Sequence, residues 1–436
     1  MVGGRDARGN DAVVKKHLST GDLYLHADLH GAASCALKRV DGLELGEDDD
    51  IALEGVCNFR IIQSINGAPE DVQLLHSDPD EYSGVESDPN TLAILFDYVK
   101  NDWVNEFSTL AELEQFVRGQ PVFNKFACIV KEKPDGSKKY RIIMDSKLSG
   151  VTAASSKQDR SELPLQTDII NDIMALMGNC KTAEAMALLV LDAESAFWQV
   201  PLHPKERRFY CAMPRASDGS TRYLAYARTP QGSRGAPLSW SQIFGLICRC
   251  VSSVVRDPVI PDAHEFEVYV DDPILALHGT VVANQEAAAL AILAWTALGV
   301  GLSFRKGQFG KRVDWIGATF STHAGGLDAT IKAERLEELS LLTDKLLSSN
   351  LVSTADLRSY IGKAQSIASL LFTWRPFVHM MYAALKEDGT SDAPPNCRWT
   401  RQVRIPLLWI RAFLQSTEPG SLVRSWTVAG LSLIHI

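Results

Sequence analysis

The 436-residue sequence lacks the features that mark a membrane or secreted protein. It contains no run of eighteen apolar residues, which argues against a membrane-spanning helix. The first residues, MVGGRDARGND, have no apolar signal-peptide core, and the eight cysteines are scattered without a CxxC pair. These absences predict a protein of a reducing compartment, cytoplasmic or nuclear and not secreted, with no membrane partner.

The sequence also lacks the positive net charge typical of nucleic-acid-binding proteins, but its charges are unevenly distributed. The formal net charge is −9, yet residues 41–90 contain fourteen Asp or Glu against one basic residue, Arg60. Residues 123–147 contain seven Lys or Arg against three acidic residues. A basic body behind an acidic segment favours phosphate binding by the body, although a solvated basic surface explains the same pattern.

Hydrophobic periodicity divides the chain into an acidic segment, a mixed body and a helical part. Residues 41–90 are rich in Asp, Ser, Pro and Gly, as in a poorly ordered linker. Within residues 91–325, strand-like runs such as ALLVLD, EFEVYV and ILAL alternate with helix-like runs, and RVDWIGATF is predicted to be a final strand. Two amphipathic helices are expected within residues 326–390, the second with a capping box of Ser353 and Asp356.

Two adjacent aspartates, Asp271 and Asp272, separate the runs EFEVYV and ILAL, and a third, Asp192, ends ALLVLD. Like carboxylates about 3 Å apart cannot both stay ionised without a nearby cation. Oxygen ligands at rigid strand ends suit Mg²⁺, and Asp192 with Asp271 could hold two ions about 3.5–4 Å apart for phosphoryl transfer. For the Asp pair alone, a solvated turn is the commoner explanation.

The order of these segments resembles the reverse transcriptase family, the RNA-directed DNA polymerases of retroelements. FACIVKEKPDGSKKYRIIMD is similar to the fingers hairpin, LDAESAFWQVPLHP to the first palm motif, RTPQGSRGAPLSW to the second and YVDD to the third. LGVGLSFRKGQFGKRVDWIG is similar to the lysine motif and primer grip, and YIGKAQSIASLLFTWRPF to the thumb of DIRS-like or related elements. The resemblance covers residues 91–390. It implies an α+β right-hand polymerase with fingers, a βαββαβ-type palm and an all-helical thumb.

The resemblance implies a role for each matching residue. The catalytic group would comprise Asp192, Asp271, Asp272 and Lys306, with Asp192 and Asp271 holding two Mg²⁺ ions (or Mn²⁺) and Lys306 as general acid. Nucleotide binding would involve Lys131, Lys133, Arg141, Phe197, Gln231 and Gly232, with Phe197 excluding a 2′-OH. Primer or template binding would involve Trp315, Gly317, Gly362, Lys363 and Arg375. Phe197 in plain core packing is the alternative at that position.

Two positions depart from the family pattern, and at one of them Ser195 stands where some members carry an acid. Pro273 directly follows the Asp pair, where the family usually carries an aliphatic residue. Proline lacks a backbone N–H and fixes φ, which a hairpin edge tolerates.

Both ends of the chain differ from a polymerase. Residues 2–39, with DLYLHADLHGAAS, resemble part of the NFACT-R domain of ribosome-quality-control factors, so residues 1–40 are expected to be a fragment of that domain in a chimeric chain. Residues 391–430 are expected to begin a connection region. Residues 431–436, LSLIHI, are expected to be a translated sequencing adapter.

Together, these patterns predict a nucleotidyltransferase, the reverse transcriptase of a retrotransposon. It would extend a primer 3′-OH on an RNA or DNA template with dNTPs, and its partners would be the template–primer duplex and dNTPs. The sequence leaves the oligomeric state open. An inactive chimeric fragment and a ribosome-associated adaptor of the NFACT type stay open as alternatives, whereas Phe197 and YVDD argue against an RNA-dependent RNA polymerase.

Overall fold

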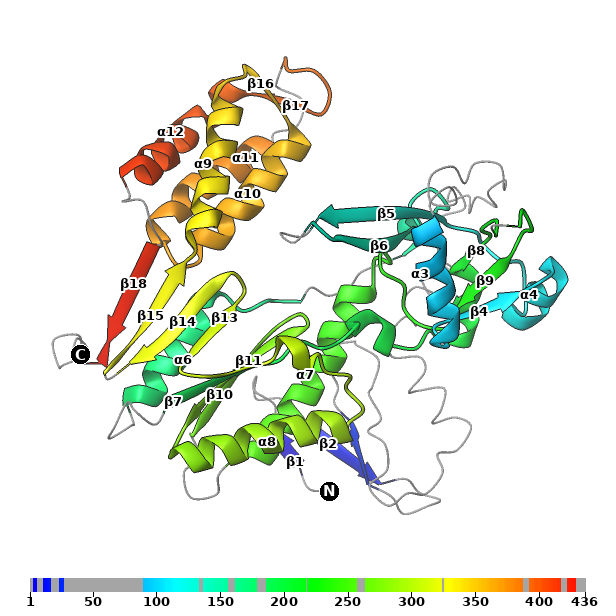
Figure 1. Ribbon diagram of the computed structural model, residues 1–436, viewed down its shortest axis with the longest axis horizontal. Helices are drawn as coiled ribbons and strands as arrows, with labels where there is room; N and C mark the ends of the chain where they lie inside the picture. The colour runs from blue at the N-terminus through cyan, green and yellow to red at the C-terminus, as the bar shows by residue number, and fades with distance from the viewer. Residues whose placement is uncertain are drawn as a thin grey trace. The chain divides into compact units, whose positions relative to one another are not determined.

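The computed structural model describes residues 3–5, 11–16, 23–26 and 89–428, the last range with short gaps (Figure 1). The gaps are residues 133–135, 156–160, 179–185, 217, 257–262, 324, 387–391 and 417–421. Lys133, residues 41–88 of the acidic segment and residues 431–436 therefore lie outside the described residues. Residue contacts divide the chain into two compact units, Met1–Ser161 with Ser195–Phe244, and Glu162–Glu194 with Gly245–Ile436.

The first unit contains three small antiparallel sheets. The strands are β1 (Gly3–Arg5), β2 (Asp11–Lys16) and β3 (Leu23–His26); β4 (Val104–Phe107), β9 (Tyr223–Tyr226) and β8 (Cys211–Ala212); and the hairpin of β5 (Lys125–Glu132) and β6 (Lys138–Asp145). The helices are α3 (Pro89–Lys100), α4 (Leu110–Val117) and α5 (Val151–Ala154), with 3-10 helices η3 (Ala196–Gln199) and η4 (Pro204–Phe209). The β5–β6 hairpin is the one that the sequence predicts around PDGS.

Aromatic packing fixes the centre of the first unit. The rings of Trp103 and Trp198 stack with centroids 4.9 Å apart, and Tyr98 and Tyr226 lie against Trp198 at 4.5 and 5.7 Å. Such ring pairs contribute about 0.5–1.5 kcal/mol each beyond the area that they bury. Because Trp198 belongs to η3, this cluster holds the segment that carries Phe197.

The second unit contains a four-stranded antiparallel sheet in the order β10 (His264–Tyr269), β11 (Asp272–His278), β7 (Met186–Val190) and β12 (Gln308–Gly310). Along the chain, α7 (Ala236–Val255) follows β7, and α8 (Val281–Ala297) follows β11. The elements therefore occur in the expected order β–α–β–β–α–β. Among the described helices only α7 is long and apolar enough to cross a membrane, and buried core helices share these properties.

A second sheet of this unit corrects the prediction for RVDWIGATF. That segment forms two strands, β13 (Arg312–Trp315) and β14 (Ala318–His323), with a tight turn at Ile316 and Gly317, whose φ angles are 35° and 85°. The sheet continues with β15 (Gly326–Ile331) and β18 (Leu422–Thr427), in the order β13-β14-β15-β18. Glycine adopts a positive φ without a steric penalty, which permits the turn.

The helical part is larger than the sequence predicts. It contains α9 (Ala333–Leu347), α10 (Thr354–Ala368), α11 (Arg375–Lys386) and α12 (Thr400–Ser416). It continues past residue 390, and a small sheet of β16 (Leu351–Ser353) and β17 (Cys397–Trp399) shows that it is not all-helical. Half of the predicted capping box of α10 is present, since the Ser353 hydroxyl accepts a hydrogen bond from the Asp356 N–H at 3.0 Å. The Asp356 carboxylate accepts from the Ser353 hydroxyl at 2.8 Å, whereas a capping box would have it accept from the Ser353 backbone N–H.

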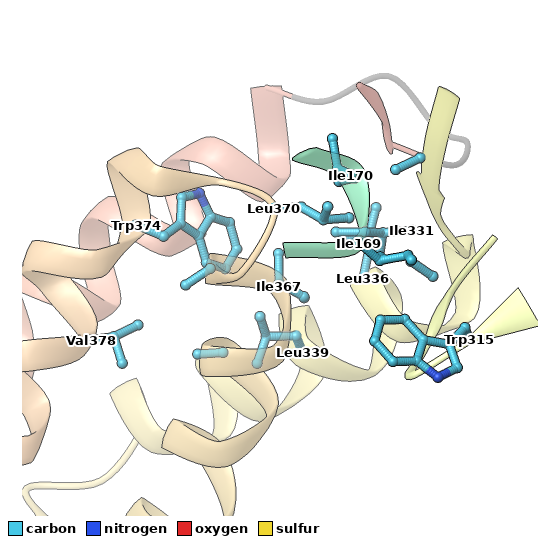
Figure 2. Packing of buried hydrophobic residues seen from close by; sticks show 14 of the residues in the cluster. Ile169, Ile170, Trp315, Ile331, Leu336, Leu339, Ile367, Leu370, Trp374 and Val378 are labelled. Atoms are coloured by element: carbon cyan, nitrogen blue, oxygen red, sulfur yellow. The ribbon is translucent and has the colours of Figure 1, made fainter. Parts of the chain in front are cut away.

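One hydrophobic core joins the elements of the second unit. It contains residues of α6 (Gln166–Gly178), of both sheets and of the four C-terminal helices. Figure 2 shows Ile169 of α6, Trp315 of β13 and Leu336 of α9 within this cluster. Each large side chain that is fully buried contributes about 1.5–3 kcal/mol. The strand ends that carry the aspartates are therefore supported by a continuous core.

Candidate active site

Asp192 follows a strand that is buried along its whole length. All five residues of β7 are buried, and so is Leu191, whereas the Asp192 side chain is 26% exposed. The Ser303 N–H donates a hydrogen bond to the Asp192 carbonyl at 2.9 Å. The sequence places an acid where the buried strand ends, and this backbone contact holds it there.

Asp271 lies in the tight turn between β10 and β11. Tyr269 pairs with Asp272 in the hairpin, so Val270 and Asp271 form a two-residue turn. Val270 has φ 59°, an unusual conformation for a β-branched residue that costs on the order of 1–3 kcal/mol. The Ala193 N–H donates a hydrogen bond to the Asp271 carbonyl at 2.9 Å, so the segment after Asp192 contacts the turn directly.

The three carboxylates influence one another electrostatically. Burial, followed by the negative charges of Asp192 and Asp271, raises the pKa of Asp272 to about 7, whereas the charge of Lys306 opposes the increase. One oxygen of Asp272, Oδ1, is buried and has no hydrogen-bond partner among the residues that the structure describes. The clustering that the sequence predicts for the aspartates is therefore present.

Lys306 provides the positive charge at this cluster. It lies in the 3-10 helix η5 (Phe304–Lys306), and its Nζ donates a hydrogen bond to Asp192 Oδ2. This hydrogen bond, followed by the charges of the aspartates, raises the pKa of Lys306, although the side chain is 65% exposed. A raised pKa makes the ammonium a weaker acid, so in this arrangement Lys306 acts as a counter-ion of Asp192.

The donor set fits a magnesium ion held by two carboxylates. Across residues 89–428, gaps excepted, no group of three or more His, Cys, Asp or Glu side chains is arranged to hold a metal by itself. Mg²⁺ is often bound by one or two carboxylates together with substrate phosphates. Asp192 and Asp271 match this chemistry, and the buried Oδ1 of Asp272 beside them has no hydrogen-bond partner among the described residues.

Trp315 differs from the expectation of a primer contact. Its side chain is only 1% exposed, and its Nε1 donates a hydrogen bond to the Asp272 carbonyl at 2.8 Å. A buried indole cannot present its face to a primer. Its observed role is to anchor the beginning of β11, and therefore the Asp pair.

Gly317 lies in the β13–β14 turn, where two residues missed by sequence reasoning hold the backbone. Arg335 Nη1 donates to the Gly317 carbonyl at 2.8 Å, and Gln166 Nε2 donates to the Ile316 carbonyl at 3.0 Å. A Cβ on Gly317 would overlap the Arg335 guanidinium. No motif signals Arg335 or Gln166, because both are far from the turn in sequence.

The remaining expected primer or template residues lie on the C-terminal helices. Gly362 is exposed on α10 with open space around it. Lys363 forms an ion pair with Glu338 at 2.7 Å. Arg375 begins α11, and its guanidinium lies 4.4 Å from the centre of the Phe372 ring. These positions leave Gly362 open to a ligand, whereas Lys363 and Arg375 are engaged with neighbours.

The expected nucleotide-binding residues belong to the first unit. Lys131 and Arg141 are exposed on the β5–β6 hairpin, and Phe197 is half-buried in η3. Gly232 has φ 106°, and a Cβ there would overlap the Met144 carbonyl, so no larger side chain fits. The carbonyl of the neighbouring Gln231 accepts a hydrogen bond from Met144 N–H at 2.8 Å. The side-chain Oε1 of Gln231 is buried and has no hydrogen-bond partner among the described residues.

Comparison with known proteins identifies two different families in the chain. Residues 130–320 match the reverse transcriptase (RNA-dependent DNA polymerase) family, a family of nucleotidyltransferases. Residues 1–74 match the NFACT protein RNA binding domain. The chain is therefore chimeric, with a reverse transcriptase segment behind an NFACT-type segment.

The curated relatives match a short part of the chain. The ribosome quality control complex subunit NEMF of Mus musculus and that of Homo sapiens are each 52% identical over 42 residues, and the homologue of Drosophila melanogaster is 38% identical over 45 residues. Each match covers 10% of this chain and 4% of the relative. Among solved structures, a foamy viral protease-reverse transcriptase in complex with double-stranded DNA is 14% identical, with a TM-score of 0.48, over 79% of this chain and 52% of that one.

Proposed function

We propose that the chain is the RNA-directed DNA polymerase of a retrotransposon and extends a primer 3′-OH with dNTPs. The observation that carries the proposal is the contact between Ala193 N–H and the Asp271 carbonyl, which brings Asp192 and Asp271 to one place. Both residues lie within the segment that matches reverse transcriptases. In this proposal, residues 91–325 form the fingers and palm, and the C-terminal helices form the thumb.

Asp192 and Asp271 would hold two magnesium ions, which supply stabilisation of the charge on the reacting phosphate. Lys306 Nζ holds a proton beside Asp192 Oδ2, and we propose that it protonates the leaving pyrophosphate once that hydrogen bond is broken. Trp315 acts as a positioning residue through its hydrogen bond to Asp272.

In the same proposal, the first unit binds and selects the nucleotide. Lys131 and Arg141 would bind the triphosphate, because guanidinium and ammonium groups are the usual phosphate ligands. The ring of Phe197 would exclude a ribose 2′-OH, and this predicts a preference for dNTPs over rNTPs. Gly232 would allow the backbone to approach the substrate, since its position accepts no side chain.

Primer extension with an Asp271→Asn variant tests this proposal. The change is nearly isosteric and lies at an exposed turn, so the fold should persist while extension on a primed RNA template falls at least about 10³-fold. Asp344→Asn, which alters an exposed aspartate of α9, serves as the control and should extend like the wild type. Wild-type extension by the Asp271→Asn variant would refute the polymerase assignment.

A second candidate function rests on the NFACT match of residues 1–74. The matched relatives are subunits of a ribosome quality control complex, and the match to this chain covers 4% of each relative's length. A ribosome-associated adaptor should co-sediment with ribosomes, and deletion of residues 1–74 should abolish the association. Primer extension that survives this deletion would assign the activity to the reverse transcriptase segment.

A further inference from the structure

A concavity in the first unit lies between α4 and η4, outside the residues considered so far. It has a volume of about 630 Å³. Four of its nine lining residues are basic and none is acidic. The basic residues are Arg118, Lys205, Arg207 and Arg208. In a chain with a net charge of −9, so dense a group of cations around one hollow indicates an anionic ligand.

The structure holds one of these cations in a fixed place. The Arg208 carbonyl accepts a hydrogen bond from Val122 N–H at 2.7 Å. The Arg208 guanidinium lies 4.4 Å from the centre of the Phe209 ring. It also lies beside Gly119, where a Cβ would be 3.6 Å from Arg208 Nη1. A guanidinium stacked on a ring keeps its N–H donors in its own plane, where they can bind phosphate oxygens.

The other cations converge from two elements. Arg118 is the C-cap of α4, in the left-handed conformation with φ 54°, and it is exposed. Lys205 is exposed in the first turn of η4, and Arg207 lies 5.7 Å from the centre of the Phe116 ring. The partial negative charge at the C-terminal end of α4 is offset by Arg118 itself.

None of the nine residues that line the hollow is acidic. Glu206, in the same 3-10 helix, is completely buried and therefore does not reach the opening. Glu112 of α4 is occupied by the capping box with Thr109. In the described part of the chain, no ion pair joins Arg118, Lys205 or Arg208 to an acidic side chain.

We propose that this basic hollow binds the phosphate backbone of a single-stranded nucleic acid. Forked guanidinium donors suit phosphate oxygens, and four cations around one hollow can contact several phosphates of a charged polymer. The choice of nucleic acid among polyanions rests on the proposed polymerase function. The lining of the hollow includes none of Asp192, Asp271 and Lys306.

The test uses the full-length chain and a fluorescein-labelled 20-nucleotide RNA, with binding measured by fluorescence anisotropy. The variant Arg118→Asn/Lys205→Glu removes two cations and suits the positive φ of residue 118, because asparagine tolerates that conformation. We expect RNA binding at 0.1 M salt to weaken about tenfold, and the slope of log K against log salt to fall by about 1.4, for two phosphates at about 0.7 each.

The variant Lys345→Glu/Arg404→Asn is the matched control, because it makes the same charge change on exposed residues of α9 and α12. It should bind RNA within about twofold of the wild type. Equal weakening by both variants, or no weakening by the first, would overturn the proposal. Competition by poly-glutamate as strong as by RNA would also overturn it, since the hollow would then select acidic peptides. If the double variant does not fold, Lys205→Glu alone, at an exposed position, decides the question.

Failure of this proposal differs from failure of the polymerase function. The binding assay is run in EDTA with Asp271→Asn as the background, so it does not depend on extension. A wild type without extension but with hollow-dependent RNA binding would refute only the polymerase function. Primer extension by the wild type, together with unchanged RNA binding by the Arg118→Asn/Lys205→Glu variant, would refute only the proposal that the basic hollow binds RNA.

Discussion

At the scale of single residues, the contact between Lys306 and Asp192 has two opposite effects. The ammonium neutralises a carboxylate that lies beside two others, and this stabilises the site without a metal. The same ammonium occupies an oxygen, Asp192 Oδ2, that a magnesium ion would need. Metal binding and the Lys306 hydrogen bond therefore compete.

Lys306→Met should bind divalent cations more tightly than the wild type. An exposed ion pair is worth up to about 1 kcal/mol, so a gain in affinity of up to about fivefold is expected, measured by titration with Tb³⁺ as a luminescent probe. Primer extension should nevertheless fall about 10²-fold or more, because the proton donor is lost. Lys311→Met, at an exposed lysine nearby in sequence, is the control. Unchanged or weaker Tb³⁺ binding by Lys306→Met would contradict the competition.

The sequence predicts single residues well where a short motif carries them. Asp192 and Asp271 follow apolar strand-like runs, and the structure brings them together as expected. Trp315 shows the limit, because a motif match does not reveal whether a side chain is buried. The cations of the basic hollow come from two segments about ninety residues apart along the chain, so only the fold brings them together.

At the scale of secondary-structure elements, the hairpin of β10 and β11 explains why Pro273 is tolerated. Pro273 pairs with Val268, one step beyond the pair of Tyr269 and Asp272 that closes the turn. In an antiparallel ladder such a neighbouring pair exchanges no N–H bond across the hairpin. The register with β7 begins only at Ile274, so the missing N–H of Pro273 leaves no bond of the central strand unmade.

Two glycines that the sequence assigns to the same kind of site should respond oppositely to alanine. Gly317→Ala places a Cβ at φ 85° against Arg335, so the free energy of unfolding should fall by about 1–3 kcal/mol. Gly362→Ala lies within α10 with open space, and should raise it by about 0.5–1 kcal/mol. Urea unfolding of both variants measures the difference. Equal effects of the same sign would show that the β13–β14 turn is not constrained as described.

Glu267 of β10 should make stability dependent on pH. Burial, followed by the charges of Asp172, Asp168 and Glu265, raises its pKa to about 7. The folded state therefore binds a proton that the unfolded state has already released between about pH 4.5 and 7, and the free energy of unfolding falls as pH rises through this range.

Glu267→Gln should remove this dependence. Between pH 5 and pH 8, the free energy of unfolding of the variant should therefore increase relative to that of the wild type. Because the side chain is only half-buried, we expect this difference to be about 1 kcal/mol. Urea unfolding at pH 5, 6, 7 and 8 measures the effect, with Glu337→Gln on the exposed surface of α9 as control. Parallel pH profiles for the wild type and Glu267→Gln would contradict the assignment.

At the scale of the whole chain, the sequence predicts the type of secondary structure in each part better than it predicts where each element begins and ends. The order β–α–β–β–α–β that the resemblance implies and the two amphipathic helices α9 and α10 that periodicity predicts are both present. The strand in RVDWIGATF is wrongly continued through Gly317, because only the positive φ there reveals the turn. The helical part extends to Ser416 because α12 shares a core with the preceding helices, which local periodicity does not show.

Truncation after Ser416 should destabilise the second unit. The removed strand β18 pairs with β15 along six residues, and Arg424 contacts the Phe372 and Trp426 rings. The loss of these backbone bonds and contacts should cost about 2–4 kcal/mol, measured as a lower urea midpoint. Truncation after Val428 retains β18 and serves as control. A midpoint that does not differ between the two truncations would show that β18 adds no stability.

The pairing of β18 with β15 also has a consequence for synthesis on the ribosome. β15 emerges long before β18, and the four helices α9 to α12 are translated between them. Until then the nascent chain carries an open strand edge, which invites pairing with other polypeptides. A ribosome that pauses within the helices would therefore hold a chain prone to aggregation, and a chaperone that covers β15 should raise the yield of native protein.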